Sequence, residues 1–227
     1  METQAEQQGD VLTYLDLFRY KSLRKITIPS MILFLSSSIL FYMPFYLVTQ
    51  FGFNFYLNGL IINLSELISF PFCLYSVRTL KRRVFVCICL IVALLASFIL
   101  VFIDKNRICT QNCWNARMVG ELGLFIILRF FICMEFQIIY VYIFELYPSQ
   151  VAVMSFSIES LMVNLSNAFL PELISSMNGV NFPVMILGCL ASGVGMLALI
   201  PLRETYGERR WRNLTRRALR PRNSQRA

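Results

Sequence analysis

The apolar residues of this chain come in six long blocks, not in the short helical or strand periods of a soluble domain. Each block is long enough to cross about 30 Å of hydrocarbon, since a helix rises about 1.5 Å per residue. Hydrophobic residues make up 57% of the 227 residues and charged residues 15%, whereas a soluble domain has about 25% charged residues. We therefore predict an all-α membrane protein with six transmembrane helices, at residues 26–48, 55–77, 84–103, 119–144, 151–176 and 181–200.

The positive charge lies between and beside these blocks. Of the 21 lysines and arginines, 17 lie in residues 19–25, 78–83 and 203–227. Such banding is the positive-inside pattern of a multi-pass membrane protein, and it argues against a nucleic-acid partner. With six spans, both termini face the cytoplasm, in a plasma membrane or an intracellular membrane. The predicted domains are a cytoplasmic segment at 1–25, a six-span bundle at 26–202 and a basic cytoplasmic tail at 203–227.

The chain contains seven cysteines and no histidine, which excludes a histidine-containing metal site. Five of them lie inside apolar blocks, where we expect small buried residues. Cys109 and Cys113 lie in a polar gap that is extracellular or luminal by alternation. They either form a disulfide or remain two free thiols. We find no nucleotide-binding motif, and we expect neither a cofactor nor an enzyme activity.

Four charged residues lie deep inside the predicted spans, away from the ends of the spans. A charge near the middle of a span costs roughly 3 kcal/mol, so it needs a partner or a water-filled cavity. These residues are therefore the first candidates for a solute pathway: Glu66, Arg129, Glu135 and Glu159.

Neutral polar and aromatic residues add to this set. Asn63 lies one helical turn before Glu66, and Asn164 lies one turn before Asn167, so each pair shares a helix face. Gln137, two residues after Glu135, belongs to the same set. These side chains either line a solute pathway or make interhelical hydrogen bonds worth about 0.6 kcal/mol each. The rings of Phe41, Tyr42 and Tyr140 either offer cation–π surface to a cationic solute or serve in packing. In the last block we expect Gly188, Gly193 and Gly195 to allow close helix contact.

Several segments in order along the chain match one known family. FQIIYVYIFELYPSQV at 136–151 resembles the tenth span and following turn of the organic cation, organic anion and carnitine transporters, within the major facilitator superfamily. The flanking segments are also similar to that family, in the family's order: LDLFRYKSLRK, FGFNFYLNGLI, RTLKRR and PLRETYGE. Sugar transporters share the E-x-x-P-[ST] and P-E-T-x-G elements, so they remain competitors.

The resemblance implies a half of a larger fold. The family has two six-helix halves around a cavity at the membrane midplane, and this chain corresponds to the carboxyl-terminal half. Either it is a fragment, or it assembles with itself or with an amino-terminal partner chain. The implied function is transport of a small organic ion by alternating access.

The resemblance also assigns roles to individual residues. Glu66 falls on the acidic position of the family's eighth span and Arg129 on a basic position of its tenth. Asn164 falls where cation carriers have aspartate and anion carriers arginine, so the sign of the substrate charge stays open. Glu66 and the aromatic first span favour a cation or zwitterion. The implied substrate-binding residues are Glu66, Arg129, Asn164, Tyr42, Tyr140 and Gln137.

A gate is implied at the FELYPSQVA turn. In the family, the turn glutamate belongs to a cytoplasmic charge latch with arginines, one of them seven residues later. That position is Ala152 here, so Glu145 has Arg82 and Arg83 as its remaining partners and we expect a weakened gate.

Two other functions fit the sequence less well. A sugar-porter half would favour Gln and Asn over four charges within the spans. A non-transporting membrane interaction protein would use the basic tail to hold a partner, whereas the ordinary interpretation of such a tail is topology and attraction to anionic lipid.

Overall fold

A computed structural model describes residues 14, 16–47, 55–105, 114–147, 149–179 and 184–202. All regular structure within these residues is helical, which confirms the all-α prediction for this part of the chain. The helices are α1 (Asp16–Arg19), α2 (Lys21–Leu47), α3 (Phe55–Thr79), α4 (Arg82–Lys105), α5 (Trp114–Leu146), α6 (Ser149–Gly179) and α7 (Met185–Leu199).

Five of these helices, α2 to α6, are long and apolar enough to cross a membrane. The last one, α7, is apolar but has 15 residues. At about 1.5 Å per residue it reaches about 22 Å, short of a bilayer core of about 30 Å. The structure thus supports a membrane protein with five long spans, and the sixth span stays a prediction.

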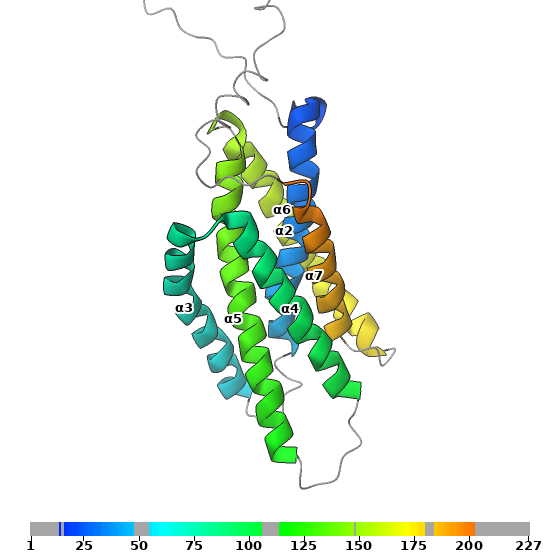
Figure 1. The fold of residues 1–227 in the computed structure, drawn as a ribbon. Coiled ribbons are helices and arrows are strands. Elements are labelled where there is room, and N and C mark those ends of the chain that lie inside the picture. The colour runs from blue at the N-terminus through cyan, green and yellow to red at the C-terminus, as the bar shows by residue number, and fades with distance from the viewer. Residues whose placement is uncertain are drawn as a thin grey trace, which may run out of the picture.

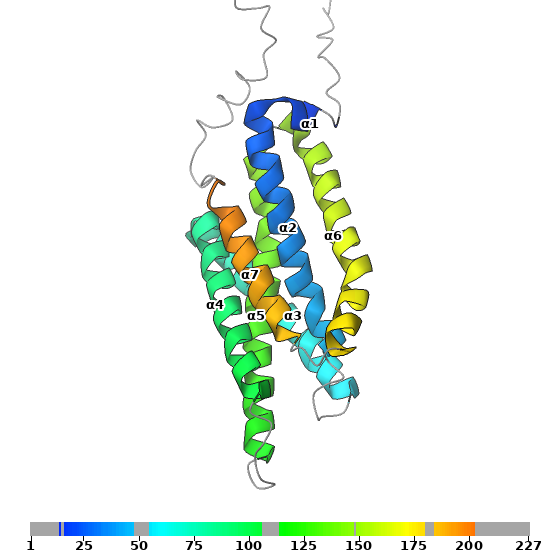
Figure 2. The same ribbon diagram turned by 90° about the vertical axis from the view of Figure 1, so that its right-hand side faces the viewer.

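The helices run up and down in one elongated bundle (Figures 1 and 2). Helix α2 packs against α5, α6 and α7, while α5 packs against α3 and α4. Helix α4 also packs along α7. Helices α3 and α6 therefore flank the α2–α5 pair from different sides.

Most of the basic residues near the helix ends lie at one end of the bundle. Helices α2, α4 and α6 begin there, and α3, α5 and α7 end there (Figures 1 and 2). We call it the basic end, after Lys21, Arg24, Lys25, Arg78, Lys81, Arg82 and Arg83.

Small residues on one face of α7 allow close packing against α2 and α4. A Cβ atom built on Gly195 would lie 2.9 Å from Ser36 Oγ, and one on Gly188 would lie 2.9 Å from Ser97 Oγ. The predicted close contact is confirmed at these two glycines. It is wrong at Gly193, where a Cβ atom would meet nothing within 4 Å.

The five cysteines of the apolar blocks are free thiols, and Cys73, Cys89 and Cys133 are buried. Cys109 and Cys113 lie outside the described residues, as do the basic tail at 203–227 and residues 1–13. The candidate disulfide therefore stays a prediction.

Candidate functional site

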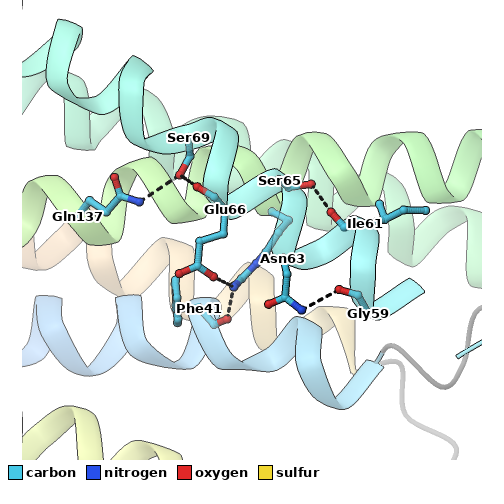
Figure 3. Close-up of polar contacts among 9 residues, drawn as sticks. Phe41, Gly59, Ile61, Asn63, Ser65, Glu66, Ser69 and Gln137 are labelled. Carbon is cyan, nitrogen blue, oxygen red and sulfur yellow. Dashed lines mark hydrogen bonds and ion pairs between the residues drawn. The ribbon is translucent and has the colours of Figure 1, made fainter. Parts of the chain in front are cut away.

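Two of the four membrane charges form an ion pair between α3 and α5. Arg129 Nη2 donates to Glu66 Oε2 at 2.9 Å (Figure 3). The Arg129 side chain is 0% exposed, whereas that of Glu66 is 32% exposed. Since each charge alone would cost several kcal/mol in the interior, the pair explains how both are held there. The sequence had indicated each residue separately, and the structure brings them together.

Arg129 also binds α2. Its Nη1 atom donates to the backbone oxygen of Phe41 at 2.5 Å. The Arg129 Cζ atom lies 4.3 Å from the ring centroid of Phe41 and 4.5 Å from that of Phe45. Pro44 lies between Phe41 and Phe45 in the sequence and lacks an amide hydrogen, so α2 has one internal hydrogen bond fewer here, at the backbone oxygen of Leu40. The guanidinium thereby joins α2, α3 and α5 at one point.

The contact between α3 and α5 continues in the next turns. Gln137 Nε2 donates to Ser69 Oγ at 3.0 Å, and Ser69 Oγ donates to the backbone oxygen of Glu66 at 2.7 Å (Figure 3). Gln137, another predicted site residue, is thus linked to the backbone beside the ion pair.

Aromatic rings lead from the ion pair along α2 and α5. Phe41 stacks on Phe136 with ring centroids 4.4 Å apart, and Phe136 meets Tyr140 edge-on at 5.1 Å. Tyr42 meets Phe41 edge-on at 5.3 Å. Both predicted tyrosines therefore belong to the ring cluster that begins at Arg129, and both are half-buried.

The polar residues of α6 lie apart from this pair. Asn164 is exposed on α6, a helix that packs on α2 and α5. Tyr46 of α2 donates a long hydrogen bond of 3.5 Å to Asn167 Oδ1. Asn63 donates to the backbone oxygen of Gly59 at 2.8 Å within its own helix. The structure therefore does not bring Asn164 into contact with Glu66 or Arg129.

Glu135 is a buried carboxyl group between α5 and α2. Ser37 Oγ donates to Glu135 Oε1 at 2.5 Å. Glu135 Oε2 is buried and has no hydrogen-bond partner among the described residues. The next residue of α2, Ser38, makes a hydrogen bond to Ser166 of α6. Adjacent serines of α2 therefore contact both α5 and α6.

Glu159 is buried in a hydroxyl cluster near the basic end. Tyr147 donates to Thr27 Oγ1 at 3.1 Å and lies 3.0 Å from Ser30 Oγ. Burial raises the pKa of the Tyr147 phenol to about 12, and the negative charge of Glu159 adds to this rise. Within the described part of the chain, neither oxygen of Glu159 has a hydrogen-bond partner.

The hydroxyl hydrogens of this cluster are already used. Thr27 donates to the oxygen of Leu23, and Ser30 donates to the oxygen of Thr27. Ser155 donates to the oxygen of Val151. These bonds run to backbone oxygens of the same helices, so in this arrangement the three hydroxyls are not aligned with the carboxyl group.

The implied gate residues lie at the basic end. Arg82 Nη2 contacts Glu145 Oε1 at 2.5 Å, and Arg82 Nη1 donates to the backbone oxygen of Val77 at 3.0 Å. Arg83 reaches the other way, to the backbone oxygen of Ile200 at 3.0 Å. Arg82, rather than Arg83, therefore joins the α3–α4 turn to the end of α5.

Together these features allow ionic and aromatic binding without covalent chemistry. Among the described residues, no cluster of three or more His, Cys, Asp and Glu side chains is arranged to hold a metal ion.

Comparison with known proteins agrees with the resemblance of the motifs. The chain is 28% identical over 195 residues to solute carrier family 22 member 3 of Rattus norvegicus, and equally to that of Mus musculus. The chain resembles a solute carrier family 22 transporter. The alignment covers 85% of the chain and 33% of each relative, so the chain spans about one third of the length of the curated relatives it matches. No protein-family model matches the chain.

Solute carriers are transporters rather than enzymes, and the apolar helices fit a multi-pass protein of this kind. Neither the sequence pattern nor the resemblance to solute carrier family 22 predicted the hydroxyl cluster of Thr27, Ser30 and Tyr147. A signal was present in the sequence, because Thr27 and Ser30 lie one turn apart near the start of the first apolar block. Their use by Tyr147 depends on the packing of α2 against the end of α5.

Proposed function

We propose that this chain forms the carboxyl-terminal half of a membrane carrier that moves a small organic cation or zwitterion by alternating access. In this proposal α7 and its neighbouring residues complete a sixth span, and the basic end faces the cytoplasm with both termini. The resemblance to solute carriers supports transport at the level of the family. The preference for a cation rests on the ion pair.

The unequal exposure of the ion pair carries the proposal. Glu66 is 32% exposed, while Arg129 is 0% exposed beneath the rings of Phe41 and Phe45. A cationic group can therefore approach the carboxylate, but an anionic group cannot reach the guanidinium without displacing those rings. A carboxylate accepts up to about four hydrogen bonds, and Arg129 supplies one of them. Glu66 thus keeps capacity for a bound cation.

The aromatic cluster supports the same sign of charge. Phe41, Phe136, Tyr140 and Tyr42 lie next to the pair, and aromatic faces attract cations, most strongly where water is excluded. A hydrophobic ammonium ion would find both a counter-charge and ring surface here.

The Arg82–Glu145 contact supports the alternating-access part of the proposal. It ties the α3–α4 turn to the end of α5 at the basic end. In this proposal, breaking this contact opens that end, since a partly exposed ion pair contributes only modestly to stability. Position 152, where the resemblance implies an arginine, is a buried alanine.

Equilibrium binding to the full chain in lipid nanodiscs tests the proposal. The probes are tetraethylammonium for a cation, benzoate for an anion and glucose for a neutral sugar. We expect saturable binding of tetraethylammonium, weakened at least about tenfold by Glu66→Gln, because a charge-assisted contact is lost. Vesicles that contain the chain alone then test for uptake, and vesicles with an amino-terminal half test for assembly.

Glu172→Gln is the matched control, since Glu172 is an exposed acid on α6. Its binding of tetraethylammonium should equal that of the unaltered chain. Benzoate binding of equal strength would contradict the cation preference. Tighter binding of glucose than of either ion would favour the sugar-porter interpretation, and no binding of any probe in the presence of both halves would refute the proposed function.

A further inference from the structure

A cavity of about 390 Å³ opens between the start of α4 and the end of α7, at the basic end of the bundle. The two helices lie side by side there in both views (Figures 1 and 2). Its lining combines two basic residues with apolar side chains. Those that matter here are Lys81, Arg83, Val84, Ile88, Met196 and Leu199. This cavity is separate from the Glu66–Arg129 pair and has no part in the proposed function.

The mouth of the cavity is cationic. Lys81 is exposed, and Arg83 is held by its hydrogen bond to the backbone oxygen of Ile200. That bond uses one of about five donors on the guanidinium. Helix α4 begins at Arg82, so the positive end of its dipole lies at the same place. Among the described residues that line the cavity, none is acidic.

The wall of the cavity is apolar and runs along the bundle. Val84 and Ile88 are one helical turn apart and exposed on the same side of α4. Met196 and Leu199 face them from α7. An elongated hydrocarbon chain fits such a wall, while the cations above it fit a phosphate group.

We propose that this cavity binds an anionic phospholipid from the membrane leaflet at the basic end, with its phosphate at Lys81 and Arg83 and an acyl chain along α4 and α7. Basic pockets between membrane helices are suited to such head groups. The following tail is a poor competitor for the cavity, since residues 203–227 contain nine arginines and two acidic residues. Its charge matches that of the cavity mouth and so repels it.

The test measures lipid binding rather than transport. The full chain, purified in detergent, is titrated with phosphatidylglycerol and phosphatidylcholine, and bound lipid is counted by native mass spectrometry. We expect phosphatidylglycerol to bind more tightly. Lys81→Gln with Arg83→Gln should reduce this preference by roughly tenfold to thirtyfold, given about one kcal/mol per basic residue near an anionic surface.

Two further variants separate the cavity from general surface charge. Arg24→Gln with Lys25→Gln removes two exposed charges from α2 at the same end, and the preference should stay unchanged. Ile88→Trp keeps both cations but fills the apolar wall, and it should also weaken phosphatidylglycerol binding. An equal loss in the α2 variant, or none in the cavity variants, would overturn the proposal.

Inorganic phosphate distinguishes the source of the anion. If millimolar phosphate displaces phosphatidylglycerol completely, the cavity is an anion site rather than a lipid site and the proposal fails. If removal of residues 204–227 alone produces lipid binding that the full chain lacks, the tail occupies the cavity, which also refutes it.

Discussion

Arg129 is completely buried while its partner Glu66, 2.9 Å away, is about one-third exposed. The two members of the pair therefore depend on each other to different degrees. The carboxylate retains access to the surroundings of the bundle, whereas the guanidinium is compensated by Glu66, by the Phe41 carbonyl and by two rings.

This asymmetry predicts unequal effects of removing either partner. Glu66→Leu leaves the buried Arg129 charge without its counter-ion and should cost about 3–5 kcal/mol. Arg129→Met keeps most of the side-chain volume and leaves a carboxylate that is partly solvated, so it should cost less. Thermal unfolding of the two variants in the same detergent ranks them.

The double variant Glu66→Leu with Arg129→Met serves as the control for this pair. It should be more stable than Glu66→Leu alone, because no buried charge remains. Equal unfolding temperatures for the two single variants would mean that the exposure of Glu66 has no energetic role.

Replacing Glu159 is expected to raise the stability of the protein, whereas replacing Glu66 is expected to lower it. The carboxyl group of Glu159 is buried next to the Ser30 and Tyr147 hydroxyls, and within the described residues neither of its oxygens is in a hydrogen bond of good geometry. Glu159→Gln supplies two amide hydrogens of nearly the same shape, which can pair with Ser30 and Tyr147. We expect the variant to gain about 1–3 kcal/mol in stability, the range of a buried polar group that acquires a partner.

Glu172→Gln makes the same chemical change at an exposed position of α6 and should alter stability by less than about 0.5 kcal/mol. A loss of stability in Glu159→Gln, measured beside this control by thermal unfolding, would show that the carboxylate itself is needed at that position.

The sequence predicted the helices and the membrane charges well, because apolar blocks and charges within them are local signals. It did not predict that Glu66 and Arg129 meet, since their pairing depends on how α3 and α5 are rotated against each other. The glycines of α7 illustrate the same limit. Gly193 and Gly195 are two residues apart, so they lie on opposite sides of the helix. Composition alone does not say which side faces α2 and α4.

The gate shows a similar distinction between neighbouring residues. The motif indicated both Arg82 and Arg83 as partners of Glu145. The structure pairs Arg82 with Glu145 and directs Arg83 to α7, because adjacent positions at the start of a helix point about 100° apart.

The latch contact predicts a change in access at the basic end. Arg82→Gln removes the ion pair with Glu145 and should increase the rate at which a thiol reagent modifies a cysteine placed in the buried hydroxyl cluster by Ser155→Cys. Since exposed or partly exposed ion pairs contribute about 0–1 kcal/mol, we expect a severalfold increase rather than full opening.

Arg83→Gln is the matched control for the latch. It leaves the Glu145 contact in place, so the modification rate should stay that of the unaltered latch. A larger effect of Arg83→Gln than of Arg82→Gln would assign the latch to the other arginine.

The packing of α7 gives a matched pair of identical substitutions. Gly195→Ala places a Cβ atom 2.9 Å from Ser36 Oγ and 3.3 Å from a methyl group of Leu90. These side chains must move, and Ser36 must give up its hydrogen bond to the backbone oxygen of Leu33, at a cost of about 1–3 kcal/mol. Gly193→Ala meets nothing within 4 Å and should gain up to about 1 kcal/mol from the higher helix propensity of alanine. Thermal unfolding in one detergent should separate the two variants in opposite directions from the unaltered chain. If both alanines were tolerated equally, α7 would not pack against α2 and α4 as closely as these contacts require.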